Sequence, residues 1–346
     1  MSSDTVYDLS HAGGVNEDAS PAAEDEDILL KGVSIYYLQT VLLQEVQHAG
    51  LDVNKAKVYD MEPDLKSKNF GLIRRKGANV KCPRDHQLGA AYVDSINGED
   101  FVGRANVMLS YTWGYGIQDI VSTLAAKCKR DNRNPKRTYI WICCLCNNQH
   151  RIGQADIPFD EFRNTFYNTV TGVGTVWSMM SPWASPMYLK RVWCVFEVYV
   201  ANTEKGVTSE IIMPEEQKNA MMKSLENIDN LFDALSNTRI EDAEASKPED
   251  KNNILALVKA LIGFNELNNT VNVLLRKWIL VTLMAEVDDV NLDANSDNNV
   301  DYADKLFNLA RAFSEMDSKD VALDIHYGPK GAIDFLQGWR AQSLLK

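Results

Sequence analysis

Short apolar runs alternate with amphipathic segments between residues 104 and 215, and this alternation restricts the possible folds more than any other feature of the chain. Residues 105–111 (ANVMLSY) form an apolar run that ends in a loop with two glycines, and residues 117–129 continue with helical spacing. Residues 138–146 (TYIWICCLC) are almost all β-branched, aromatic or cysteine. Such a run is typical of a strand buried on both faces of a parallel sheet.

The same alternation continues to residue 215. We expect helices over residues 159–170 and 189–202, and strands over 174–180 and 210–213. Strands that alternate with helices predict an α/β fold, a parallel sheet flanked by helices, with functional loops at the carboxyl ends of the strands. The strands at 107–109, 140–145 and 176–178 should be adjacent and parallel.

Composition divides the rest of the chain. Residues 1–28 are rich in Asp, Glu, Ser, Ala and Gly, which predicts a disordered acidic tail. Residues 29–103 are expected to form an N-terminal α+β segment that includes a helix over 33–48. The α/β domain is predicted to span 104–215. A helical region over 216–286, with helices at 220–235, 253–264 and 270–286, and a helical pair over 287–346 make the C-terminal part mostly α-helical.

Charge and cysteine content limit the classes of partner. Lys and Arg total 36 against 48 Asp and Glu, a formal net charge of -12, which repels nucleic-acid phosphates and anionic membranes. The most apolar stretch, 271–284, is interrupted by Arg276 and Lys277, so we expect no membrane span. The first residues lack the basic and apolar regions of a secretory signal. Six cysteines, most of them within apolar runs, favour a reduced cytoplasmic protein.

The most specific local pattern is LKRVWCVFE at residues 189–197, which contains Trp193, Cys194 and Glu197. It resembles the Trp-Cys-hydrophobic-x-Glu motif of TIR (Toll/interleukin-1 receptor) domains, and SYTWG at 110–114 is similar to the first strand and loop of that family. The resemblance covers about a third of the chain. It is closest to TIR-like sequences of the algal and protist type, which combine SxxW, an apolar strand ending in NQH, and RxWCxxE. The fold that it implies is TIR-like, related to flavodoxin.

In enzymatic TIR domains, the motif glutamate cleaves the nicotinamide glycosidic bond of NAD, and Glu197 occupies that position. A carboxylate that faces a pocket can stabilise an oxocarbenium-like ribosyl transition state. The alternative is that Glu197 is a solvated helix residue beside two core anchors. Two departures from the family bear on the choice: Cys143 follows Trp141-Ile142 where the protist sequences carry an acidic residue, and SPWASP at 181–186 replaces a compact connection.

The residues expected to contact NAD come from two loops. Ser110, Trp113 and Gly114 belong to the first loop, where Trp113 could stack on an aromatic ring and glycine amides could face an anionic group. Asn148 and His150 follow the second strand and could contact a ribose or a phosphate. The alternatives are a tryptophan packed in the core and a polar turn that ends a strand. Zinc is not expected, because strand alternation puts Cys144 and Cys146 on the face opposite to Cys143.

A second resemblance lies at residues 293–304 (DANSDNNVDYAD), which is similar to a twelve-residue EF-hand calcium loop. Asn298 stands where that loop has glycine, and an aspartate stands at its last position. Residues 326–337 (HYGPKGAIDFLQ) resemble a degenerate partner loop. The alternative is a surface linker rich in Asp and Asn. The calcium ligands implied by the resemblance are Asp293, Asn295, Asp297, Asn299, Asp301 and Asp304.

Three functions remain open from the sequence. The first is TIR-like intracellular signalling with hydrolysis of NAD at Glu197. The second is a non-enzymatic interaction or scaffold module that self-associates or docks other signalling proteins, with calcium as a regulator. The third is a structural subunit of a larger assembly. Resemblance in fold does not choose among them.

Overall fold

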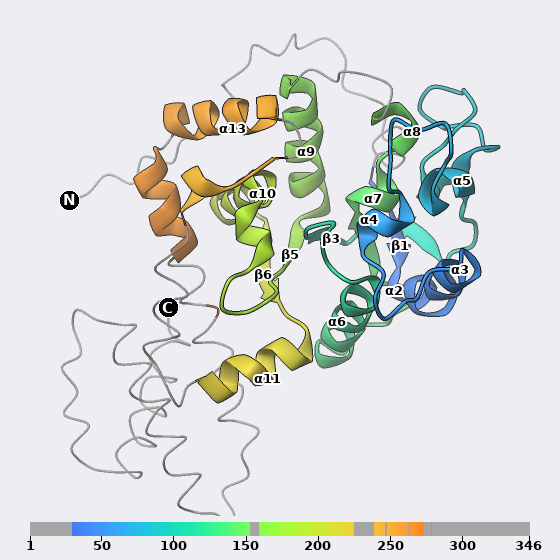
Figure 1. Ribbon diagram of the computed structural model, residues 1–346, viewed down its shortest axis with the longest axis horizontal. Coiled ribbons are helices and arrows are strands. Elements are labelled where there is room, and N and C mark those ends of the chain that lie inside the picture. Colours follow the sequence, from blue (N-terminus) through green and yellow to red (C-terminus); the bar gives the residue numbers. More distant parts are fainter. Residues whose placement is uncertain are drawn as a thin grey trace, which may run out of the picture. The chain divides into compact units, whose positions relative to one another are not determined.

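A computed structural model describes residues 30–152, 159–224, 239–245, 248–261, 263–272 and 278 (Figure 1). The chain divides into two compact units. The first contains the sheet, the helices around it and residues 240–267. The second contains residues 181–186 and helix α11 (Glu215–Ser224), where the Trp183 backbone N–H donates to Gln217 Oε1 at 3.1 Å.

The first unit is built on a mixed six-stranded sheet with the order β2-β1-β4-β3-β5-β6. Its strands are β1 (Lys31–Ser34), β2 (Val102–Arg104), β3 (Val107–Ser110), β4 (Tyr139–Ile142), β5 (Thr175–Met179) and β6 (Thr208–Ile212). The four strands β4, β3, β5 and β6 run parallel, which confirms the predicted adjacency of the three central strands. The expectation of a wholly parallel sheet is wrong at one edge, because β1 pairs antiparallel with both β4 and β2.

The central strands are buried on both faces. All four residues of β3 are buried, as are the last four of β5. Side chains on both faces of these strands therefore lie in the core, which explains why their sequences are continuous apolar runs without alternation.

The second predicted strand is shorter than expected. Strand β4 ends at Ile142, and Cys143–Cys146 form the helical turn α7 instead of continuing the strand. The Asn147 N–H closes this turn on the Cys143 carbonyl at 3.1 Å, and Gln149 Nε2 donates to the same carbonyl at 3.0 Å. Strand alternation therefore does not govern where the three cysteines of this turn point.

The predicted helix at residues 33–48 begins two residues later than expected. Residues 31–34 form the edge strand β1, and helical residues then run through α2 (Ile35–Tyr37), the π-helix η2 (Leu38–Leu42) and α3 (Leu43–His48). Ser34 ends the strand and caps the helix, because its hydroxyl accepts from the Tyr37 N–H at 3.0 Å. One serine thus sets the change from strand to helix.

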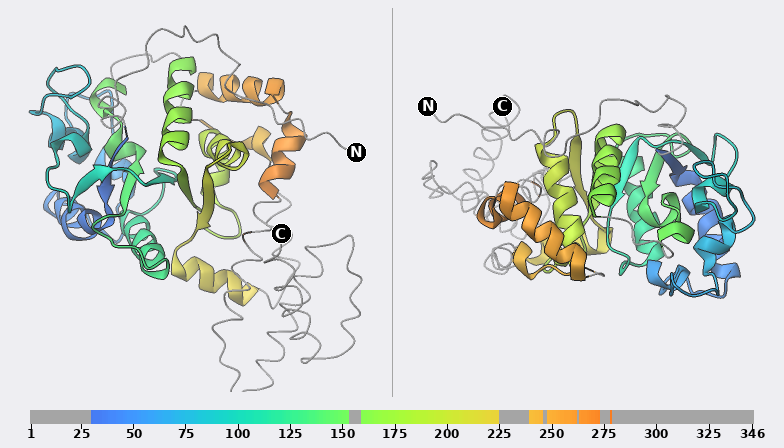
Figure 2. Two further views of the ribbon diagram at one scale, coloured as in Figure 1. Left: turned by 180° about the vertical axis from the view of Figure 1, so that it is seen from behind. Right: turned by 90° about the horizontal axis from the view of Figure 1, so that it is seen from above.

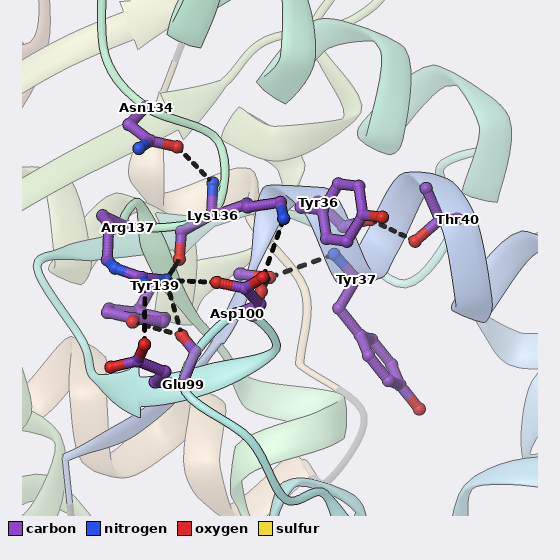
Figure 3. Close-up of polar contacts among 10 residues, drawn as sticks. Tyr36, Tyr37, Thr40, Glu99, Asp100, Asn134, Lys136, Arg137 and Tyr139 are labelled. Atoms are coloured by element: carbon purple, nitrogen blue, oxygen red, sulfur yellow. Dashed lines mark hydrogen bonds and ion pairs between the residues drawn. The ribbon is translucent and has the colours of Figure 1, made fainter.

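The boundary predicted at residue 103 does not separate two folding units. Strands β1 and β2 belong to the same sheet as the central strands, and the segment between them contributes α4 (Val58–Met61), α5 (Leu72–Gly77) and η3 (Tyr92–Ser95). Figure 3 shows how Asp100, just before β2, meets Lys136 and Arg137, just before β4, at 2.7 Å each. These two cations hold the pKa of Asp100 below its usual range.

Helices cover the sheet in two groups. Helices α9 (Phe159–Val173) and α10 (Val192–Thr203) pack against each other and against β5, whereas α6 (Ile117–Arg130) packs against α2 and η2 (Figures 1 and 2). Helix α13 (Pro248–Leu261) packs on α10. The chain leaves the sheet unit after Pro214, close to the boundary predicted at residue 216, and residues 240–267 then return to the sheet unit.

Candidate functional site

The sheet topology points to one position at the carboxyl ends of the strands. From β3 the chain crosses through α6 to β4 on one side, whereas from β5 it crosses through α10 to β6 on the other side. The direction of winding therefore changes between β3 and β5. In open α/β sheets, ligands bind outside the carboxyl ends of the strands at such a switch point. Ser110, the last residue of β3, pairs with Ser178 of β5 at that point.

Four side chains from four elements meet there. Ser110 and Ser178 come from the two strands, Tyr188 from the 3-10 helix η4 (Met187–Lys190) and Glu197 from α10. Ser110 Oγ donates to Glu197 Oε2 and lies 2.6 Å from the Tyr188 hydroxyl, which lies 3.3 Å from Ser178 Oγ. We call these four residues the Glu197 cluster.

The motif around Glu197 explains how α10 places the carboxyl at this edge. Cys194, one turn before Glu197, is buried, and its thiol donates to the Tyr111 carbonyl at 3.4 Å. Residues three apart on a helix share a face, so the contact of Cys194 with the residue after β3 turns Glu197 toward Ser110. The Trp193 ring packs edge-on against Phe196 of the same helix, and Phe196 in turn lies beside Phe166 of α9, with ring centroids 6.4 Å apart in each pair.

Burial controls the electrostatics of the cluster. The Glu197 side chain keeps partial solvent exposure, yet the surrounding protein removes enough water to raise its pKa well above the ordinary value. Burial also raises the pKa of Tyr188 well above its usual range, and the charges of Cys194 and Glu197 add to this effect. A raised pKa in a half-buried carboxyl is a common property of catalytic acids and bases.

Trp113 and Cys143 lie beside the cluster. The Trp113 indole N–H donates to Cys143 Sγ at 3.5 Å, and burial raises the pKa of the Cys143 thiol, with the Glu197 charge adding to the effect. Cys143 therefore places a neutral thiol near Glu197, at the position where the protist sequences carry an acidic residue. Trp113 is half-buried, and its ring lies 5.8 Å from that of Tyr59.

The loop of Gly114 does not form an anion cradle. Its backbone N–H groups already have protein acceptors: Gly114 donates to Thr112 Oγ1 at 3.4 Å, Tyr115 to the Thr112 carbonyl and Ile117 to the Ala56 carbonyl. The Asp119 carboxylate lies 2.8 Å from where a Cβ on Gly116 would stand. Negative charge thus already occupies the start of α6, which argues against the predicted contact of these amides with a phosphate.

Asn148 and His150 attach the turn after β4 to the N-terminal part of the chain. Asn148 Nδ2 donates to the Gly89 carbonyl at 2.8 Å, and His150 Nε2 lies 2.9 Å from the Arg74 carbonyl. His150 is buried and packs edge-on against Phe70 at 4.8 Å. These contacts support the interpretation as a polar turn with structural partners rather than as ligands of a ribose.

The sequence did not single out Ser178 and Tyr188. Ser178 lies inside an apolar strand, and Tyr188 lies next to the SPWASP insertion without a motif of its own. Only the pairing of β3 with β5 and the path of η4 bring both hydroxyls to Ser110. An apolar cavity elsewhere, lined by residues such as Leu38, Val58, Tyr111, Ile120 and Leu145, contains no member of the cluster.

Within the part of the chain that the structure describes, no group of three His, Cys, Asp or Glu side chains is arranged to hold a metal ion. The predicted calcium ligands from Asp293 to Asp304 lie outside the described residues, as does the acidic tail before residue 29. No helix among the described residues is long and apolar enough to cross a membrane.

Comparisons of this chain with family models, with curated proteins and with solved structures found no match.

Proposed function

We propose that the sheet unit is a TIR-like domain that hydrolyses NAD, with Glu197 as the catalytic carboxyl. The reaction joins NAD and water to give nicotinamide, ADP-ribose and a proton. One observation carries the proposal: the half-buried residue Glu197 places a carboxyl with a raised pKa at the switch point between β3 and β5.

The chemistry fits a carboxyl in this position. As the glycosidic bond breaks, its electron pair moves to the nicotinamide nitrogen and positive charge develops on the ribosyl carbon. An ionised Glu197 would stabilise that charge and orient the attacking water. Desolvation raises the pKa of Glu197 and so disfavours its ionised form. The cationic nicotinamide ring of bound NAD would therefore favour the ionised form.

Trp113 supports the binding of an aromatic ring next to this carboxyl. Its half-buried indole donates to Cys143, whose pKa the Glu197 charge helps to raise, and its partly exposed neighbour Tyr59 extends the aromatic surface. A nicotinamide or adenine ring could stack there. In this proposal Trp113 binds substrate, and Ser110 acts on Glu197.

Release of nicotinamide from NAD by the full chain tests the proposal. Glu197→Gln keeps the shape of the side chain and removes its charge, so release should fall by about 100-fold or more. Glu204→Gln is the matched control, because Glu204 caps the end of the same helix and accepts from Tyr167 at 3.0 Å. That control should keep wild-type turnover. Equal loss in both variants would assign the effect to α10 and not to the Glu197 carboxyl.

A second candidate function, an interaction module, is favoured by the apolar side chains around the same loop. Tyr59 is 44% exposed and Met187 37% exposed, and Gly114 lies between Trp113 and the Met187 methyl group. Exposed apolar side chains that gather in this way mark interfaces. Wild-type protein that releases no nicotinamide, but whose mass in sedimentation rises with concentration, would favour this function over hydrolysis.

A further inference from the structure

We propose that Ser178, Tyr188 and Ser110 form a hydroxyl relay that positions Glu197 and reverses its hydrogen-bond direction when Glu197 ionises. The inference deepens the proposed function and rests on it for its catalytic consequence. In this account Ser110, Ser178 and Tyr188 are positioning residues, because they act on the substrate through Glu197.

The relay is continuous and shielded. Ser110, Ser178 and Tyr188 are 1% exposed or less. The 2.6 Å contact between Ser110 and Tyr188 is a strong hydrogen bond, and the 3.3 Å contact between Tyr188 and Ser178 is a weaker one. Only Glu197, at the end of the chain of hydroxyls, keeps contact with solvent. Charge on Glu197 therefore acts on the buried hydroxyls through hydrogen bonds and not through water.

Each hydroxyl carries one hydrogen, so the direction of donation is determined by the state of Glu197. When Glu197 is ionised, Ser110 donates to it. The short contact must then use the hydrogen of Tyr188, which is withdrawn from Ser178, its other acceptor at 3.3 Å. The hydroxyl dipoles of Ser110 and Tyr188 then both point toward the carboxylate. Such a chain strengthens the bond at its charged end.

When Glu197 is protonated, every donation runs the other way. The carboxyl hydrogen is donated to Ser110, Ser110 donates to Tyr188, and Tyr188 donates to Ser178, with each hydrogen used once. The relay thus satisfies both protonation states by rotation of hydroxyl groups alone. A residue that alternates between acid and base needs such a set of partners.

Other titratable groups near Glu197 do not supply this function. Those on which Glu197 acts electrostatically are Tyr188 itself, Cys143 of α7 and Cys194 of α10. Both thiols are held neutral by burial, which raises their pKa. On each of the packed elements α9, β6 and α13, one such group has another partner: Tyr167 bonds Glu204, Glu210 pairs with Lys127 and Lys251 pairs with Glu244.

Removal of the Tyr188 hydroxyl should change the ionisation of Glu197 more than its position. Tyr188→Phe keeps the ring but breaks the relay in the middle. The ionised state loses the cooperative bond to a charge, and the protonated state loses a weaker neutral bond. The pKa of Glu197 should therefore rise further, by about one pH unit.

The test is a carbon NMR titration of protein labelled with 13C at the glutamate carboxyl groups. The Glu197 signal is identified as the one missing from Glu197→Gln. Its midpoint should move upward in Tyr188→Phe and further in Ser110→Ala. It should stay at the wild-type position in Tyr36→Phe, whose ring packs over Lys136. An unchanged midpoint in Tyr188→Phe would overturn the relay. If Tyr188→Phe does not fold, Ser110→Ala applies the same criterion.

This titration needs no NAD, so it separates the relay from the proposed reaction. If the wild type releases no nicotinamide, the hydrolysis proposal fails, and the titration still decides the relay. If the wild type does release nicotinamide, the acid limb of its pH profile of kcat should shift to higher pH in Tyr188→Phe. The shift should equal that of the NMR midpoint, and KM should stay unchanged. A uniform loss of kcat at every pH, without movement of the limb, would assign Tyr188 a merely structural role.

Discussion

Desolvation raises the pKa of Glu197. The folded chain therefore loses stability when this carboxyl is ionised. A carboxyl whose pKa is higher in the folded than in the unfolded chain stabilises the fold only while it is protonated. Its contribution is fully present below the ordinary value of 4.5 and is lost as the pH rises through the folded value. At higher pH the ionised carboxyl opposes folding.

Glu197→Gln should therefore be more stable than the wild type at neutral and alkaline pH. The amide stays neutral, so the difference in unfolding free energy should be near zero at pH 4 and grow by at most about 1.4 kcal/mol per pH unit through the window. Urea unfolding from pH 4 to pH 8 measures it, with Glu204→Gln as the control. A difference in unfolding free energy that does not depend on pH would show that desolvation of the ionised Glu197 does not destabilise the fold.

The sequence identified two of the four residues of the Glu197 cluster and missed the other two. Glu197 and Ser110 were found because they belong to motifs that can be recognised within a few residues. Ser178 and Tyr188 were missed because their role depends on which strand lies beside β3 and on the path of the chain after β5. Asn148 and His150 showed the reverse: their polar character was clear, but their partners Gly89 and Arg74 lie far away in the sequence.

At the scale of elements, the close approach of backbones limits substitution more than side-chain volume does. Helix α5 ends at Gly77, which packs directly on the loop before η3. A Cβ at Gly77 would stand 2.1 Å from the Ala90 carbonyl oxygen. Because that neighbour is backbone, it cannot move aside without shifting the loop.

Gly77→Ala should destabilise the chain by about 1–3 kcal/mol, although alanine is the better helix former. The control is Gly114→Ala, where the nearest atom to the new Cβ is the Met187 methyl carbon at 3.8 Å. We expect a change of about 0.5 kcal/mol or less there. Thermal unfolding of both variants measures the contrast. Equal stability of the two would mean that the contact of α5 with residue 90 adapts without cost.

The sequence predicted whether a segment is a helix or a strand more accurately than it predicted where that element begins and ends. The three central parallel strands were predicted from apolar runs that only burial on both faces explains. The turn Cys143–Cys146 was taken for strand because a buried strand and a buried helical turn are equally apolar over four residues. The predicted helix wrongly included the last two residues of β1, because this strand covers only four residues and its last residue is the helix cap.

For the molecule as a whole, the N-terminal segment is part of the sheet unit and not an addition to it. The buried pair of Glu62 and Arg74 orders the loop before α5, and the Arg74 carbonyl then meets His150 after β4. The sequence placed a boundary at residue 103 because composition changes there. It could not show that β1 and β2 pair with the central sheet, since pairing between distant edge strands leaves no local pattern.

This attachment should weaken in mild acid. Burial lowers the pKa of His150 below its ordinary value of 6.5, so the stability that its neutral form provides is fully present above 6.5 and is lost as the pH falls toward the folded value. Unfolding by urea between pH 7 and pH 5 should show this loss in the wild type and less of it in His150→Gln. The exposed His48→Gln should behave like the wild type. Parallel pH profiles for all three proteins would show that protonation of His150 does not cause the loss of stability in acid.

Hydrolysis of NAD by the carboxyl of Glu197 is our proposal for the reaction of this chain. A proton NMR time course of NAD with the full chain, repeated over a range of protein concentrations in case activity needs self-association, tests it most directly. We expect nicotinamide and ADP-ribose to appear in equal amounts, and Glu197→Gln to leave NAD intact under the same conditions. NAD that stays intact with the wild type at every concentration, or that is cleaved equally well by Glu197→Gln, would contradict it.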